Sequence, residues 1–122
     1  MNAIYLWVLP DRLMLPATYA RSHFDAGGAR NHIATLIGTD GGVLPIPQDL
    51  KVSRLVGDRA QIQTYIPASR AHGVYAFVIE GEINCDGTTL GRRDSAGIWN
   101  ADRLAFETGA GETDVLFVET IM

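Results

Sequence analysis

Short hydrophobic runs alternate along this chain with clusters of Gly, Asp, Asn and Pro. Runs rich in Val, Ile, Leu, Tyr and Phe between such residues are typical of β-strands, and helical periodicity is weak throughout. The pattern predicts strands over residues 3–8, 33–37, 50–56, 61–66, 74–80, 82–85, 97–99, 103–108 and 115–120. Many short strands without intervening helices predict an all-β sandwich or barrel, because a parallel α/β architecture would need crossover helices.

The connections between these runs carry the residues that chain reversals need. Gly or Asp occurs within residues 39–42, 56–58 and 108–111, where a turn requires positive φ or a side chain that bonds its own backbone. Asp86-Gly87 is the strongest hairpin signal in the sequence. The turns therefore favour antiparallel strands.

Alternation within the runs predicts which side chains face the core. In the run over 61–66, Ile62 and Ile66 share one face, whereas the two glutamines share the other face with Tyr65. When one side of a strand packs on a core, that side is the more apolar one. The isoleucine face is therefore expected to be the buried one.

Two further runs, over residues 74–79 and 115–118, are apolar on both faces. A strand of this kind is typically covered on both sides. We expect both runs to lie in the centre of a sandwich or beneath an interface.

The N-terminal run is unusual because a long polar stretch separates it from the next strand. Pro10, Pro16 and polar residues up to Gly28 follow an apolar run that contains Ile4, Tyr5, Leu6, Trp7 and Val8. A terminal strand on so long a tether can pair far from its sequence neighbours or with a second chain. We expect residues 1–28 to form an extended strand and linker, with residues 4–8 at a homodimer interface.

Composition narrows the function classes. The chain has 122 residues, which predicts one domain over 1–122, since two cores would each bury too little apolar surface. Hydrophobic residues make up 47% and charged residues 20%, as in soluble globular proteins. The N-terminal apolar run is too short to span a bilayer, and no basic residue precedes it as in a signal peptide, so a cytoplasmic location is expected. A net charge of −4 without a basic block disfavours nucleic acid or an acidic membrane as partner.

The sequence contains one cysteine, Cys85, which excludes a disulfide within the chain and a cysteine zinc cluster. A nucleophilic cysteine needs a base and an electropositive surrounding. The near neighbours of Cys85 are Glu82, Asn84 and Asp86, which disfavour the thiolate. A structural role is therefore expected for this thiol.

Four stretches of the chain carry the features of one family. They are Leu6-Trp7-Val8-Leu9-Pro10 with Pro16 and Tyr19, residues 43–49 ending in Gln48-Asp49, the segment Val78-Ile79-Glu80-Gly81-Glu82-Ile83 continued through Asp86-Gly87, and residues 90–94 with 115–117. In these stretches the chain resembles the C-terminal cupin half of pirin-like proteins, the group that includes bacterial quercetin 2,3-dioxygenase-type bicupins. The resemblance implies a cupin fold, which is a double-stranded β-helix or jelly-roll-like barrel. It also implies that the chain corresponds to one half of the usual two-cupin protein.

The resemblance further implies where a metal would bind. Cupin oxygenases of this kind hold iron or another divalent metal through three histidines and a glutamate. When the closing glycine of the first cupin motif is aligned with Gly81, the first histidine position falls on Pro67 or Ala68 and the second on Ser69 or Arg70. The glutamate position falls on Val74. The second motif needs a later histidine, and the sequence has none after His72. We therefore expect no metal and no cofactor.

Side chains that could bind a ligand remain. His23, His32 and His72 lack the close spacing that would place two rings on one face, so hydrogen-bonded or surface roles are expected for them. Two interpretations stay open for Arg70 with His72: a surface pair, or a carboxylate site near a barrel mouth. Aromatic residues on strands belong either to the core or to a cavity for an apolar ring. The candidate ligand-binding residues are Arg70, His72, Tyr65, Tyr75 and Trp99.

These observations favour a non-catalytic domain over an enzyme. The first hypothesis is a cupin domain that lacks the usual metal site, serves binding or assembly, and forms a homodimer through its N-terminal strand. One alternative is a metal-dependent dioxygenase of the quercetinase type with an unusual ligand set. The other is a small-molecule sensor with a carboxylate pocket that contains Arg70.

Overall fold

The structure is a computed structural model that describes residues 3–9, 12–38, 44, 46 and 48–122. The regular secondary structure of these residues consists of strands, which confirms the all-β prediction. The turn expected over 39–42, Pro10, and residues 43, 45 and 47 of the segment 43–49 lie outside the described residues. The strands are β1 (Ile33–Ile37), β2 (Leu50–Gly57), β3 (Ile62–Tyr65), β4 (His72–Glu80), β5 (Ile83–Cys85), β6 (Thr88–Leu90), β7 (Ser95–Ile98), β8 (Leu104–Thr108) and β9 (Thr113–Ile121).

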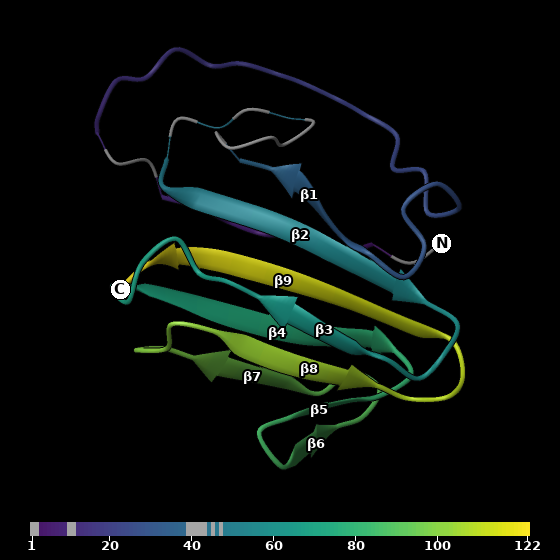
Figure 1. The fold of residues 1–122 in the computed structure, drawn as a ribbon. Helices are drawn as coiled ribbons and strands as arrows, with labels where there is room; N and C mark the ends of the chain where they lie inside the picture. The colour runs from purple at the N-terminus through teal and green to yellow at the C-terminus, as the bar shows by residue number, and fades with distance from the viewer. Residues whose placement is uncertain (1–2, 10–11, 39–43, 45, 47) are drawn as a thin grey trace.

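Two antiparallel sheets face each other (Figure 1). The larger sheet has the order β1-β2-β9-β4-β7, and the smaller sheet has the order β3-β8-β5-β6. The long strands β4 and β9 are neighbours at the centre of the larger sheet, although most of the smaller sheet lies between them in sequence. Strands that pair so far from their sequence neighbours produce the jelly-roll-like arrangement that the sequence predicts.

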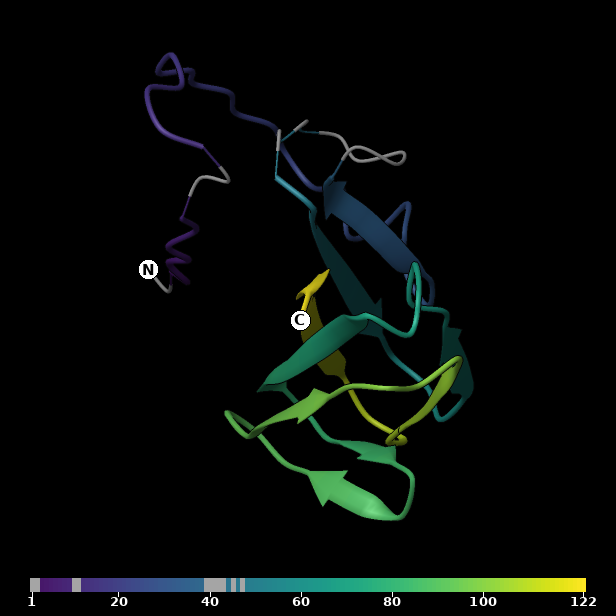
Figure 2. The same cartoon turned by 90° about the vertical axis from the view of Figure 1, so that its left-hand side faces the viewer.

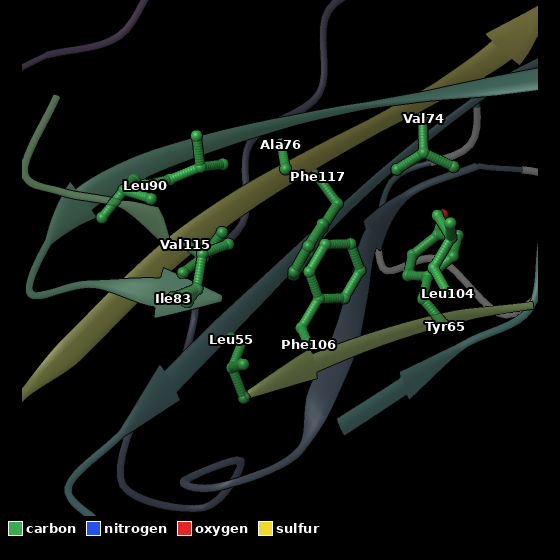
Figure 3. Packing of buried hydrophobic residues seen from close by; sticks show 11 residues of the cluster. Leu55, Tyr65, Val74, Ala76, Ile83, Leu90, Leu104, Phe106, Val115 and Phe117 are labelled. Carbon is green, nitrogen blue, oxygen red and sulfur yellow. The ribbon is translucent and has the colours of Figure 1, made fainter. Parts of the chain in front are cut away.

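The core lies between the two sheets and is filled by branched aliphatic side chains and aromatic rings (Figure 3). The rings of Phe106 and Phe117 meet at its centre with centroids 5.0 Å apart, and the ring of Tyr65 lies 5.5 Å from that of Phe117. Every second residue of β4 and β9 points inward to these rings, as the two-residue period of a strand requires. The fully buried aliphatic side chains around the rings include Leu55, Val74, Ala76, Val78, Ile83 and Val115.

The strand predicted over residues 3–8 is not formed in the single chain. Residues 3–9 run outside the larger sheet, on the side away from the smaller sheet (Figures 1 and 2). A strand needs a neighbouring backbone to bond, and the described residues offer none at this place. The apolar character of this segment agrees with the sequence pattern, and its pairing with a second chain stays a prediction.

The burial predicted for residues 61–66 is reversed in the structure. Ile62 and Ile66 are 66% and 61% exposed, whereas Tyr65 is only 4% exposed. The face with Tyr65 turns inward because its ring stacks in the core and its hydroxyl donates to Glu119. The amide of Gln63 on the same face donates to the backbone oxygen of Asn31, so this polar group is also satisfied.

Strands β4 and β9 are fully buried on their inner faces only. Val74, Ala76 and Val78 are buried in the core, whereas Tyr75 on the outer face is 45% exposed. The outer side chains of β9 are partly covered in the same way. The prediction of burial on both sides is thus fulfilled on one side within the single chain.

The hairpin signal is confirmed, because Asp86 and Gly87 connect β5 to β6 and both have positive φ, at 51° and 81°. Strand β6 itself was not predicted, since its three residues are too few for a recognisable pattern. A tighter position is Gly81, with φ of 82°, directly after β4. A Cβ at this residue would meet the backbone of Glu112 and Thr113, so only glycine fits.

One charged cluster lies inside the barrel and is centred on Glu119, whose side chain is 2% exposed. The hydroxyl of Tyr65 donates to its carboxylate at 2.5 Å, the backbone N–H of Ala68 at 2.6 Å, and the Nζ of Lys51 lies 3.1 Å away. Burial raises the pKa of Tyr65, and its hydrogen bond to Glu119 raises this pKa further. The hydroxyl therefore remains a hydrogen-bond donor.

This cluster predicts a loss of stability in acid. Burial opposes the charged form of Glu119, but the hydrogen bonds from Tyr65 and Ala68 and the charge of Lys51 outweigh it and lower the pKa of this carboxyl below its ordinary 4.5. A carboxyl with a lowered pKa stabilises the folded state above its unfolded-state pKa, and this contribution disappears as the pH falls. The melting temperature of the wild-type protein, measured by calorimetry from pH 7 to pH 3, should therefore fall more steeply below pH 4.5 than that of Glu119→Gln. Parallel curves would contradict the role given to this carboxylate.

Candidate functional site

The outer face of the larger sheet carries a continuous set of apolar side chains, which we call the outer apolar face. The strand register places Val52, Val118 and Tyr75 in one row across β2, β9 and β4. Leu116 and Phe77 stand opposite each other in the next row. Because these residues alternate with inward-pointing core residues, they all project away from the smaller sheet. The sequence signal was the apolar character of both faces of β4 and β9.

A groove of about 260 Å³ lies on the outer apolar face where β4 begins and β7 and β9 end. Gly97 leaves it open because no atom lies within 4 Å of the position that a Cβ would take, whereas the side chain of Met122 packs against Gly73. Tyr75 and Trp99, both predicted as ligand-binding residues, line it together, and Trp99 is 67% exposed. The contributions of Val118 and Met122 were not predicted, since neither residue differs from an ordinary strand or terminal residue in the sequence. The groove can therefore receive an apolar side chain.

The N-terminal segment, residues 3–9, has a two-sided pattern of exposure. Ile4, Leu6 and Val8 are between 40% and 47% exposed. Their alternate neighbours Tyr5, Trp7 and Leu9 are between 83% and 97% exposed. A period of two residues is that of an extended chain with one side partly covered. The more exposed side thus presents two aromatic rings and a leucine to solvent.

The polar groups predicted to bind a ligand are engaged by carboxylates of the chain itself. The Nη1 of Arg70 lies 2.7 Å from Asp102. The Nε2 of His72 lies 3.0 Å from Asp49, and its Nδ1 lies 2.8 Å from the hydroxyl of Ser69. Tyr65 is in the core, where its hydroxyl bonds to Glu119. The structure therefore brings together Tyr75 and Trp99 and leaves the other three candidates in separate internal contacts.

Cys85 is the last residue of β5, and it is partly buried against the core. Burial raises the pKa of this thiol, and the charge of Asp86 raises it further. Both causes disfavour the reactive thiolate. The thiol therefore has the environment expected of a structural cysteine.

The positions that correspond to cupin metal ligands hold side chains of other kinds. Val74 points into the core, and the backbone of Ala68 donates to Glu119. Ser69 and Arg70 bond to His72 and Asp102. Within residues 3–9, 12–38, 44, 46 and 48–122, no three His, Cys, Asp or Glu side chains are grouped so that they could hold a metal ion. The described residues do not fit the three-histidine and glutamate site that the resemblance implies.

A further feature concerns membranes. Among the residues with a described structure, no helix is long and apolar enough to cross a bilayer.

Comparison with solved structures shows what this fold is similar to. YhhW from Escherichia coli superimposes with a TM-score of 0.81 at 19% identity, over 93% of this chain and 47% of that one. The bacterial pirin YhhW in complex with nickel(II), also from Escherichia coli, gives a TM-score of 0.67 at 18% identity, over 76% and 41% of the two chains. An HTH_3 family transcriptional regulator from Vibrio cholerae gives 0.60 at 13% identity, over 79% and 54%. The chain thus spans about half the length of these proteins.

Sequence comparisons agree with the fold. No curated protein matches the sequence. The family model of the quercetinase C-terminal cupin domain matches residues 33–120, which is most of the chain and includes all the strands of both sheets up to Thr120. The cupin fold and the pirin-like resemblance are therefore confirmed, and the chain belongs to the quercetinase C-terminal cupin domain family.

Proposed function

We propose that this chain is a non-catalytic assembly domain that forms a homodimer, in which residues 3–9 of each copy pack against the outer apolar face of the other. The observation that carries the proposal is the exposure of Tyr5, Trp7 and Leu9, together with the absence of a strand partner for this described segment. Aromatic side chains of this kind are enriched at the centres of protein interfaces.

The exposure of residues 3–9 alternates with a period of two residues. This supports an arrangement in which the chain itself covers one side of the segment and a second copy covers the other. Ile4, Leu6 and Val8 form the side that this chain already covers in part. The opposite side is equally apolar and solvent-exposed in the single chain. A second copy that covers it would bury two aromatic rings that otherwise remain in water.

The outer apolar face supplies a matching surface. Tyr75 is 45% exposed and Trp99 67%, and the groove between them is lined almost entirely by apolar atoms. Its volume of about 260 Å³ is sufficient for one large side chain. Trp7 is the most exposed aromatic residue of the N-terminal segment, which makes it the natural occupant.

The length of one similar protein supports an arrangement of two copies. YhhW is covered to 47% by a match that includes 93% of this chain. Two copies of the chain would therefore approach the length of that one protein. A homodimer would place two such barrels in one particle.

Removal of residues 1–10 tests the proposal. The full chain should be a dimer by size-exclusion chromatography with light scattering, and the truncated chain should be monomeric or aggregated because its outer apolar face is uncovered. Trp7→Ser should weaken the dimer about thirtyfold, as expected for a buried aromatic anchor. Met14→Ser is the matched control, since Met14 is equally exposed but lies in the linker. A truncated chain that remains a dimer, or a monomeric full chain at micromolar concentration, would refute the proposal.

Metal analysis tests the non-catalytic part separately. The purified protein should contain less than stoichiometric iron, nickel, copper or zinc, and titration with each metal should show no tight site. Tight stoichiometric binding that is lost in His32→Ala or His72→Ala would instead favour the dioxygenase alternative. The truncation experiment would still test the homodimer in that case, because dimer formation through residues 3–9 does not depend on a metal.

A further inference from the structure

A cavity of about 700 Å³ opens between the two sheets at the edge formed by β7 and the β5–β6 hairpin. Cys85, Ala96, Ile98 and Ala101, which line it, are the partly buried residues that pack against the core on this side. Leu90 and Leu104 are core residues and form its inner wall. Core side chains are therefore accessible from solvent through this cavity.

Small side chains keep this cavity open. Ala96 and Ala101 occupy positions where larger residues would fill the space between the sheets. Most of the lining consists of apolar atoms. Its volume lies within the range of about 300–1,000 Å³ that is typical of small-molecule sites. The body of a ligand in this cavity would have to be apolar.

Arg103 is the basic residue at this cavity, and it precedes β8. Five arginines of the described chain have carboxylate partners: Arg30 with Asp58 and Glu112, Arg54 with Asp114, Arg70 with Asp102, and Arg92 and Arg93 with Glu80. Arg12, Arg21 and Arg59 have none among the described residues either, but they lie outside the lining of this cavity. No such partner is found for Arg103 among the residues that the structure describes. An unpaired guanidinium beside an apolar cavity can bind a carboxylate through two parallel hydrogen bonds.

The remaining polar groups limit the charge of the ligand. Asp86 also lines the cavity, so a second anionic group on the ligand would meet a like charge. The thiol of Cys85 is held in its neutral form, because burial and Asp86 raise its pKa. The exposed Trp99 can cover an aromatic or branched body from outside. These features favour a ligand with one negative charge.

We infer that this cavity binds a small monocarboxylate with an aromatic or branched apolar body, held at its carboxylate by Arg103. The site is distinct from the carboxylate site that the sequence suggested around Arg70, whose guanidinium is bound to Asp102. The N-terminal segment contributes none of the cavity's lining residues, whereas Gly97, Ile98 and Trp99 line both this cavity and the groove proposed for the dimer.

Calorimetric titration with 3-phenylpropionate and its neutral amide, 3-phenylpropanamide, tests the inference. The acid should bind saturably and about tenfold or more tightly than the amide, because only the acid forms a charge-assisted pair with Arg103. Arg103→Gln should reduce the affinity for the acid to that for the amide. Arg59→Gln is the matched control, since this exposed arginine lies outside the cavity lining and should leave both affinities unchanged.

A second variant tests the position of the apolar body. Ala96→Phe places a ring in the cavity, so it should abolish binding of both compounds while circular dichroism shows an unchanged fold. Absence of saturable binding of 3-phenylpropionate to the wild-type protein would overturn the inference. Equal affinities for acid and amide, or an Arg103→Gln variant that binds the acid as the wild type does, would also overturn it.

Discussion

Glu119→Ala is expected to lower the free energy of unfolding by about 3–5 kcal/mol, which is the usual effect of removing one partner from a buried charged cluster. The carboxylate is the common acceptor for the hydroxyl of Tyr65, the backbone N–H of Ala68 and the ammonium group of Lys51. Its removal leaves these donors without a partner inside the barrel. Urea denaturation followed by circular dichroism measures the change.

Two further variants make this prediction specific. Glu107→Ala removes an exposed carboxyl from the outer side of β8 and should change the stability by no more than about 0.5 kcal/mol. Glu119→Gln loses the charge and keeps one acceptor oxygen, which can serve either Tyr65 or Ala68, so its effect should lie between the other two. A Glu119→Ala variant as stable as Glu107→Ala would show that the cluster does not hold β2, β3 and β9 together.

Gly81→Ala is expected to be destabilising by about 3 kcal/mol or more, for two reasons that act together. The φ of 82° is unfavourable for any residue with a Cβ. The added Cβ would also lie against the carbonyl oxygen of Glu112 and 3.0 Å from the Cα of Thr113, so the backbone at the start of β9 would have to move. The midpoint of urea denaturation gives the loss directly.

Gly87→Ala separates the two causes. Gly87 has nearly the same φ, 81°, but no atom lies within 4 Å of the position that an added Cβ would take, so only the backbone cost of about 1–2 kcal/mol applies. The difference between the two variants measures the contact at Gly81 with Glu112 and Thr113. Equal losses in both variants would mean that the loop before β9 adapts without cost.

Features encoded by neighbouring residues could be predicted from the sequence. The Asp86-Gly87 hairpin depends on the φ preferences of two adjacent residues, and its prediction needed no knowledge of the rest of the chain. The strand pattern of β2, β4, β8 and β9 was equally local. The family resemblance added the cupin topology, which the order of strands alone does not specify.

Features set by distant partners could not be predicted. The face of residues 61–66 was reversed because Tyr65 bonds to Glu119, which lies 54 residues further along the chain. The cavity at Arg103 depends on the β5–β6 turn and the β7–β8 loop, which meet at one sheet edge. The ion pair of Arg70 with Asp102 joins residues that are 32 positions apart in the sequence. The sequence alone does not show which arginines have a carboxylate partner in the folded chain.

The outermost strands of both sheets are short or irregular. Strands β6 and β7 have three and four residues, β3 has four, and the pairing of β1 is interrupted by a register shift between Thr35 and Ile37. Such borders give an incoming β-strand from another molecule little backbone to bond, which protects a β-protein against fibril-like growth. The homodimer that we propose accordingly uses the broad outer face of the larger sheet, where side-chain shape would limit the number of copies that can join.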